Sequence, residues 1–455
     1  MSKENSFLER TFKLKENGTN VRTEAVAGIT TFMTMAYILI VNPSILSATG
    51  MDAGALFTAT AVSAIIGTLC MAFFANYPFA LAPGMGLNAF FAYSVCIGMG
   101  KSWQFALTAV LLEGVIFVLL SLFKVREAIF NSIPHNLKKA VSVGIGLFIA
   151  LIGMINAGIV VSGKMIPGDD GKMILLEDGL IMELGSFGNP SVQVAIIGLI
   201  IMGLLLAYKV KGALLIGIVV TTIIGIPLGV THVGGSVVSL PPSVAPIAFK
   251  FDFSQVFSLE MLLVLFSFLF VDIFDTLGTL VGAASKADML DEKGQLPRIK
   301  GALLADSVGT IAGACLGTST VTTYVESSSG VAEGGRTGLT SVFTALGFAL
   351  ALFFAPLFGI VPSAATAPAL IIVGLFMMSA VTEINFKDYT EAVPAFLTII
   401  VMPFAYSIAE GIVFGMVSYV LMKLFTGKHK EISITMYVLS ALFVLRYVLM
   451  GLGIL

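Results

Sequence analysis

The sequence predicts an all-α protein that crosses a membrane fourteen times, in two inverted repeats of seven segments, with short extended strands in the third and tenth segments. Three observations predict this fold. Of 455 residues, 57% are hydrophobic and only 11% are charged, with a mean hydropathy of +1.00, whereas a soluble domain has about 25% charged residues. Apolar runs of about 20 residues, the length that crosses a bilayer, recur along the chain. The third member of each series of seven is interrupted.

The apolar runs divide into two series of similar character. Seven segments are expected at 23–41, 54–75, 79–99, 103–123, 138–160, 191–208 and 212–230. Seven more are expected at 259–283, 300–316, 318–336, 340–358, 366–381, 392–407 and 409–425. An extra apolar segment, 433–452, breaks this symmetry and is expected to be either a fifteenth span or an interfacial helix.

The interrupted segments are "PFALAPGMGLNAFFAYSV" and "GTSTVTTYVESSSGVAEGG". Both are too polar, or too rich in Gly and Pro, for a plain helix. Interrupted segments at matching places in two halves are the best sequence indication of the central site of a transporter.

Basic residues predict the orientation. With a cytoplasmic amino terminus and fourteen spans, 20 of the 25 Lys and Arg residues fall on the cytoplasmic side, as the positive-inside rule requires. Seven spans per half invert the second half relative to the first. Residues 1–22 are polar and basic, so no cleavable signal is expected, and the acidic loop 162–190 is expected to be external. We therefore expect a multi-pass protein of the cell (inner or plasma) membrane.

Two acids lie inside the eighth predicted span. In "FVDIFDTLGTLVG", Asp272 and Asp275 are three residues apart and so share one helix face. An ionised Asp at the bilayer centre costs about 2.5–3.5 kcal/mol on insertion scales, and such residues usually face a cavity on an ion or substrate path. The structural alternative is that one carboxylate caps or pins the broken helices by hydrogen bonding.

Glu326 is a third acid in this class. The run "STVTTYV" before it is β-branched and predicts extended backbone, which is tolerated at membrane depth only where it lines a cavity or is buried in protein. Ser327 to Gly330 are expected to begin a half-helix. Glu326 would then either bind a ligand or serve as a helix-start carboxylate.

The mirror segment contains "APGMGLNAFF". Pro83 interrupts it, and Gly84 and Gly86 allow close approach of backbone or ligand. Asn88 is open to two interpretations, a helix cap or a ligand-binding amide. Elsewhere in the spans, Glu113 and Asp306 are expected to tie helices together by hydrogen bonds.

Several classes of protein are poorly supported. His135, His232 and His429 are all expected in loops or tails, which disfavours a Ser–His hydrolase within the membrane. No ATP-binding loop is present, and the three cysteines show no metal-ligand spacing. Asp272 and Asp275 share one helix, unlike the facing aspartates of an intramembrane protease. The net charge of −2 predicts no nucleic-acid surface. We expect neither an enzyme nor a cofactor.

Four long motifs resemble one family. They are "TNVRTEAVAGITTFMTMAYILIVNPSIL", "ALAPGMGLNAFFAYSV", "LFVDIFDTLGTLVG" and "TSTVTTYVESSSGVAEGGRTGLTS". Together they resemble the AzgA-like purine permeases of the nucleobase–ascorbate transporter superfamily. The resemblance implies a core domain (residues 1–123 and 259–360; segments 1–4 and 8–11). This core moves against a gate domain (residues 124–258 and 361–455; segments 5–7 and 12–14, with the C-terminal segment).

The resemblance also implies roles for individual residues. Asn88, Asp272 and Glu326 match the substrate-binding trio of the family, with Asp275 close by. The Thr-Thr-Tyr-x-Glu run presents its backbone and Glu to the base in uracil permeases. The further binding residues that we expect on this basis are Thr276, Thr323, Tyr324, Val325, Met85 and Gly86.

Two departures favour the purine branch over a uracil or ascorbate substrate. Thr276 stands where uracil permeases have a His, one turn after the acid of the eighth span, and "ESSSG" replaces a Glu-Asn-x-Gly consensus.

These observations predict a secondary transporter that imports guanine and hypoxanthine by proton symport with alternating access. Asp272, Asp275 and Glu326 are expected to share the coupling proton, since they should not all ionise at once. The alternatives are an adenine permease of the same branch, a membrane-embedded hydrolase, and an anion transporter or channel of the same fold. The expected partners are a purine base and the lipid bilayer, not nucleic acid; a homodimer is left open.

Overall fold

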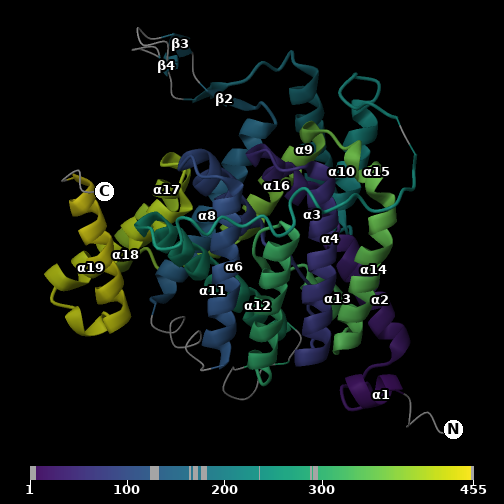
Figure 1. The fold of residues 1–455 in the computed structure, drawn as a ribbon, viewed down its shortest axis with the longest axis horizontal. Helices are drawn as coiled ribbons and strands as arrows, with labels where there is room; N and C mark the ends of the chain where they lie inside the picture. Colours follow the sequence, from purple (N-terminus) through teal and green to yellow (C-terminus); the bar gives the residue numbers. More distant parts are fainter. Residues whose placement is uncertain are drawn as a thin grey trace.

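The protein is described here by a computed structural model that covers residues 7–122, 133–162, 165–167, 173–175, 182–234, 236–286, 289 and 296–451. Its long helices lie side by side in one helical body (Figure 1). Within the described residues, ten helices have the length and apolar composition of membrane spans. They are Val21–Thr49, Ala53–Ala75, Trp103–Ser121, His135–Asn156, Pro190–Ala207, Leu259–Ala284, Ile299–Leu316, Gly338–Gly359, Ser363–Glu383 and Ile408–Phe425. Four shorter apolar helices are Met85–Gly98, Ala213–Gly225, Tyr389–Phe404 and Ile434–Leu445.

The first half of the chain contains the following elements. The helices are α1 (Phe7–Phe12), α2 (Val21–Met35), α3 (Ile38–Leu46), α4 (Ala53–Cys70), α5 (Met85–Ala89), α6 (Trp103–Leu122), α8 (His135–Asn156), α9 (Pro190–Ala207) and α10 (Ala213–Gly225). Wider π-helical turns extend α4 and α5 over Met71–Ala75 and Phe90–Gly98. The strands are β1 (Leu81–Pro83), β2 (Val160–Ser162), β3 (Met165–Pro167), β4 (Met173–Leu175) and β5 (Met182–Leu184).

The second half of the chain is also mostly helical. Its helices are α11 (Leu259–Lys286), α12 (Ile299–Leu316), α13 (Ser327–Ala332), α14 (Gly338–Ala351), α15 (Ala355–Gly359), α16 (Ser363–Met378), α17 (Tyr389–Phe404), α18 (Ile408–Phe425) and α19 (Ile434–Gly451). Its one described strand is β6 (Val321–Thr323).

The predicted multi-pass, mostly helical architecture is confirmed. The first segment differs from the prediction because it extends to Thr49 rather than residue 41, with a break between α2 and α3. The trailing segment is helix α19, which packs on α18 at one edge of the molecule (Figure 1). Part of the acidic loop 162–190 lies outside the described residues, including Asp169, Asp170, Glu177 and Asp178. Its described parts pair as β2–β5 and β3–β4 beyond the ends of the helices (Figure 1).

The two interrupted segments form strands, as predicted. Strands β1 and β6 pair antiparallel, with Leu81 opposite Thr323 and Pro83 opposite Val321. All the residues of both strands are buried. A short helix follows each strand, α5 after β1 and α13 after β6, so each broken segment consists of a strand and a helix.

The outer edges of the two strands are satisfied in the same way. Thr68 on α4 accepts from Leu81 N (2.9 Å) and donates to Leu81 O (3.0 Å). Thr310 on α12 does the same for Val321, at 3.2 and 3.1 Å. Each threonine follows a glycine, and a Cβ at Gly67 or Gly309 would lie 3.1 or 3.0 Å from a methyl group of Val321. The Gly-Thr pair therefore lets each helix approach a strand and complete its hydrogen bonds.

The helices pack in two groups. In the first, α12 packs on α4 and α6, α14 packs on α2 and α4, and α3 packs on α4. In the second, α16 packs on α8, α9 and α10, and α17 packs on α8 and α18. Helix α11 contacts members of both groups, α6 in the first and α8 and α18 in the second. We call these the α4 group and the α8 group.

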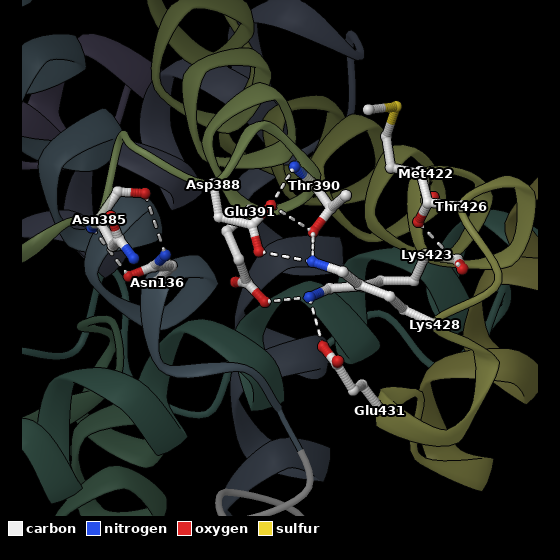
Figure 2. A network of polar contacts seen from close by, with 10 residues as sticks. All are labelled: Asn136, Asn385, Asp388, Thr390, Glu391, Met422, Lys423, Thr426, Lys428 and Glu431. Carbon is white, nitrogen blue, oxygen red and sulfur yellow. Dashed lines mark hydrogen bonds and ion pairs between the residues drawn. The ribbon is translucent and has the colours of Figure 1, made fainter.

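A network of charges joins helix ends within the α8 group (Figure 2). The buried Lys423 on α18 lies 2.7 Å from Glu391 and 2.6 Å from Glu431. Lys428 donates to Asp388 (2.8 Å), and this bond, with one from Thr390, lowers the pKa of Asp388 below its usual value. The pair is therefore charged at neutral pH and holds the start of α17 against the end of α18.

A buried acid, Glu24, connects two helices of the α4 group. Glu24 on α2 is fully buried and accepts hydrogen bonds at the start of α14, from the N–H groups of Arg336, Thr337 and Thr340 and from both threonine hydroxyls. These distances lie between 2.7 and 3.3 Å. The carboxylate thus satisfies donors at a helix start that have no partner within the helix.

Replacing Glu24 should therefore destabilise the protein. Glu24→Ala leaves several buried donors without a partner, at about 1–3 kcal/mol for each group that stays unsatisfied. We expect a clear fall in the midpoint of thermal unfolding of the detergent-solubilised protein, with a smaller fall for Glu24→Gln. The control is Glu16→Ala, which removes an exposed ion pair with Lys13 and should change little. Equal midpoints for the Ala variants would contradict this account.

Candidate functional site

A cavity of about 760 Å³ lies where the two broken segments meet the α8 group. This size is within the range of ligand pockets, about 300–1,000 Å³. The cavity is lined by parts of both broken segments, by α8, α11 and α16, and by Tyr37 from the break between α2 and α3. Its apolar walls include Val141, Ile145, Val373 and Phe376.

The backbone of both broken segments is held rigidly at the cavity. Beyond the strand pairing, Tyr324 N donates to Ala80 O and Gly84 N donates to Thr320 O, both at 2.9 Å. The hydroxyl of Tyr324 donates to Pro83 O (2.5 Å). The two segments therefore present one fixed surface to the cavity.

Glu326 lies at the start of α13 and lines the cavity. It is the N-cap residue of α13, so it stands at a helix start as the structural alternative predicted, although its side chain makes no capping hydrogen bond. Instead, Oε1 accepts a hydrogen bond from the hydroxyl of Tyr37 (2.7 Å). A carboxylate has about four lone-pair sites, so Glu326 retains acceptor capacity toward the cavity.

Asp275 also lines the cavity, from α11. Thr322 on β6 donates to its Oδ2 (3.1 Å). A Cβ at Gly84 would lie 3.3 Å from the same oxygen, so this glycine allows the first broken segment to approach the acid. Asp275 and Glu326 therefore face one cavity from two different elements.

Asp272 and Thr276 lie elsewhere, although Asp272 and Asp275 were expected to share one function on one helix face. Neither Asp272 nor Thr276 is among the residues that line the cavity, and both are fully buried. The Thr276 hydroxyl lies 2.8 Å from Asp272 Oδ1 and 2.7 Å from Oδ1 of Asp306 on α12. The predicted tie between helices through Asp306 is confirmed by this contact.

Asn88 is fully buried inside α5 and does not line the cavity. Its Oδ1 accepts from the Ser319 hydroxyl, and its Nδ2 lies 3.4 Å from Pro83 O. It therefore connects the two broken segments and does not serve as the N-cap of α5, which is Gly84. The predicted tie through Glu113 is also confirmed, because Thr320 donates to Glu113 Oε2 (2.5 Å).

The structure thus brings together most of the predicted site residues. Those that line the cavity are Met85, Gly86, Asp275, Thr323, Tyr324, Val325 and Glu326. Those that do not are Asn88, Asp272 and Thr276.

Sequence reasoning missed Tyr37 and misplaced one histidine. Tyr37 is a lone hydroxyl-bearing aromatic in an apolar run, shortly before Asn42 and Pro43, which could have indicated a break. His135 was expected in a loop, which is wrong: it is the first residue of α8 and lines the cavity together with Lys138 and Lys139. Helix α8 begins before the apolar run does, because its first turn is polar and hydropathy does not mark it.

A helical protein with many apolar spans and a cavity that two acids and two broken segments line belongs, by class, to the membrane transporters. The comparisons with known proteins agree. Residues 22–414 match the model of the Permease family. The chain is 49% identical to "Putative permease MJ0326" of Methanocaldococcus jannaschii, covering 97% of this chain and 98% of that one.

Two further relatives have more specific names. The adenine permease AdeP of Escherichia coli is 44% identical, covering 97% of this chain and 96% of the relative. The guanine/hypoxanthine permease PbuO of Bacillus subtilis is 43% identical, covering 96% and 99%. The chain belongs to the Permease family, in agreement with the resemblance of its four motifs to the nucleobase–ascorbate transporter superfamily.

The fold has a counterpart among solved structures. The transmembrane domain of the cyanobacterial bicarbonate transporter BicA matches with a TM-score of 0.64 over 87% of this chain and 97% of that one. Sequence identity is 16%, so the match concerns the fold alone.

The cavity can be tested by cysteine labelling in a background without Cys70, Cys96 and Cys315. Gly278 lines the cavity and has open space where a Cβ would lie. Gly278→Cys should react readily with a water-soluble maleimide in the folded protein. Ser307→Cys, a near-isosteric change at a fully buried position outside the cavity, should react only after denaturation. If folded Gly278→Cys reacts as little as folded Ser307→Cys, the cavity is not open to water.

Proposed function

We propose that the protein imports the oxopurines guanine and hypoxanthine by proton symport. One observation carries the proposal: Asp275 and Glu326 face a single cavity beside the fixed backbone of two paired strands. A purine is flat and carries N–H groups on its edge, so ionised carboxylates can accept from it while strand backbone pairs with its remaining edge.

Relatives support both purine classes. The names of AdeP and PbuO differ in substrate, and their identities to this chain, 44% and 43%, do not separate them. The two cavity acids favour oxopurines, because an oxopurine presents a ring N–H next to its carbonyl, where adenine presents a ring nitrogen that only accepts. Adenine remains the second candidate, since its amino group is also a donor.

Alternating access follows from the two helix groups. In this proposal the α4 group, with α5, α11, α13 and the strands, is the core domain, and the α8 group is the gate domain. The cavity lies between them, and its lining includes His135, Lys138 and Lys139 at the start of α8. In this proposal the positive-inside rule puts these basic residues on the cytoplasmic side, and the cavity belongs to an inward-facing state.

The fourteen-span, inverted-repeat arrangement is part of the proposal. It is supported by the matching Gly67-Thr68 and Gly309-Thr310 pairs. Each pair lies in the segment before a broken segment, the second and ninth of the predicted series, and Thr68 and Thr310 each complete the hydrogen bonds of one strand. Such matched devices are expected where two halves share one topology in opposite orientations.

Neutralising Glu326 should abolish transport. Glu326→Gln keeps the size of the side chain but removes the ionised acceptor, so we expect hypoxanthine uptake to fall to background in a strain that lacks its own purine transporters. The control is Glu333→Gln, nearby in the chain, which loses only an ion pair to Lys211 at the surface and should transport normally. Near-normal uptake by Glu326→Gln would remove this residue from the binding site.

An uptake panel tests substrate and coupling together. Labelled hypoxanthine should enter, unlabelled guanine should compete strongly, and uracil should not compete. A protonophore should stop accumulation above the external concentration. Adenine as the better competitor would favour the second candidate, and accumulation that survives the protonophore would exclude proton symport.

A further inference from the structure

A second group of acids lies apart from the cavity. Thr276 on α11 stands between Asp272, one turn earlier on the same helix, and Asp306 on α12. Its Oγ1 lies 2.8 Å from Asp272 Oδ1 and 2.7 Å from Asp306 Oδ1. All three side chains are fully buried, and none lines the cavity. We call these three residues the Thr276 triad.

Hydrogen counting assigns a proton to this triad. A threonine hydroxyl carries one hydrogen and can also accept through its lone pairs. It can therefore donate to one of the two carboxyl oxygens only. The other contact has hydrogen-bond length as well, and it needs its own hydrogen, which only a protonated carboxyl can supply. The geometry thus corresponds to one carboxylic acid, one hydroxyl and one carboxylate in a row.

The charges around the triad lead to the same result. Two buried carboxylates this close cannot both ionise easily. The elements packed on α12 include α4, α6, β1 and β6, and no Lys, Arg or His occurs in these four. The other acids on the surrounding elements are Glu113 on α6, Glu260 and Asp275 on α11, Glu326 before α13 and Glu410 on α18. The bases on neighbouring elements are Lys286 and Lys300 at the ends of α11 and α12, His135, Lys138 and Lys139 at the start of α8, and Lys423 near the end of α18.

We infer that the Thr276 triad is the proton-carrying site of the transporter: Asp272 and Asp306 share one proton through Thr276, while Asp275 and Glu326 bind the base. This inference rests on the proposed function and refines it. In the sequence-based expectation, Asp272, Asp275 and Glu326 shared the coupling proton. In the present inference, helix α11 carries one acid that binds the base, Asp275, and one that shares the proton, Asp272.

The proton balance is simple. In the outward-facing state a proton from outside adds to the doubly ionised pair, forming one O–H bond on Asp272 or Asp306. In the inward-facing state the same bond breaks and the proton leaves to the cytoplasm. No other covalent bond changes.

The contacts of the triad provide a path to the base. Asp306 is on α12, whose Thr310 holds both the N–H and the C=O of Val321 on β6. The next residue of that strand, Thr322, donates to Asp275. A change in the attraction between α11 and α12 therefore acts on the strand and the acid that face the cavity.

The test uses the full-length protein purified into proteoliposomes that contain a pH-sensitive dye. Asp306→Asn keeps a hydrogen-bonding side chain but cannot carry the proton. We expect it to lose proton-driven accumulation of hypoxanthine and purine-dependent proton flux, while exchange of labelled for unlabelled hypoxanthine at equal pH continues. Retained proton-driven accumulation would overturn the inference. Loss of exchange as well would also overturn it, because Asp306 would then serve the base site or the fold.

The hydroxyl provides a second, independent pair of variants. Thr276→Ser keeps the bridge and should remain coupled, whereas Thr276→Val should exchange purines without proton flux. Ser307→Ala is the matched control, since it removes a buried hydroxyl next to Asp306 that donates only to Leu303 O; it should behave like the wild type. Coupled transport by Thr276→Val would refute the role of the bridge.

The wild-type protein separates this inference from the proposed function. Wild-type proteoliposomes that move no purine would refute the proposed function, and this inference with it. Purine uptake without proton flux in the wild type would leave a purine transporter but refute both symport and the triad. Coupled wild-type transport that Asp306→Asn retains would refute the triad alone.

Discussion

The pairing of two three-residue strands inside an apolar helical body is the constraint on which the rest of the structure depends. Backbone that is not helical has unpaired N–H and C=O groups, and hydrocarbon supplies no partner for them. Strands β1 and β6 satisfy one another on their facing edges, and Thr68 and Thr310 satisfy their other edges. Because each strand needs the other, the two halves of the chain must meet at the same depth, and the cavity forms where they meet.

This constraint also explains the many hydroxyl side chains around the strands. Three polar side chains beside the break each have a hydroxyl partner: Ser319 for Asn88, Thr320 for Glu113 and Thr322 for Asp275. A serine or threonine can both donate and accept, so it can join an acid to backbone or to another acid without adding charge. Of the described acids near the strands, Asp272 and Asp306 share Thr276 away from the cavity, and Asp275 and Glu326 line the cavity.

Much of this arrangement could be predicted from the sequence, for physical reasons that also explain the failures. Apolar length marks spans, and β-branched residues before Glu326 mark the strand, so the segments and the extended stretches were found. Residue spacing on α11 showed only that Asp272 and Asp275 are neighbours. It could not show that α12 would present Asp306 to Asp272, because that depends on packing between helices distant in sequence. Hydropathy could not reveal the polar first turn of α8, nor the break that brings Tyr37 to Glu326.

The division of acids on α11 has a consequence for coupling. Asp275 lines the cavity and Asp272 lies at the contact with α12. Helix α11 therefore links the cavity, where we propose that the base binds, to the proposed proton site. A base can change the free energy of the protonated triad only if it interacts differently with the two protonation states, and the contacts through Thr310, β6 and Thr322 allow this at short range. By linkage, a proton that strengthens base binding must itself be bound more tightly when the base is present. In the proposed mechanism the base and the proton need no direct contact, because the strand pair connects their two sites.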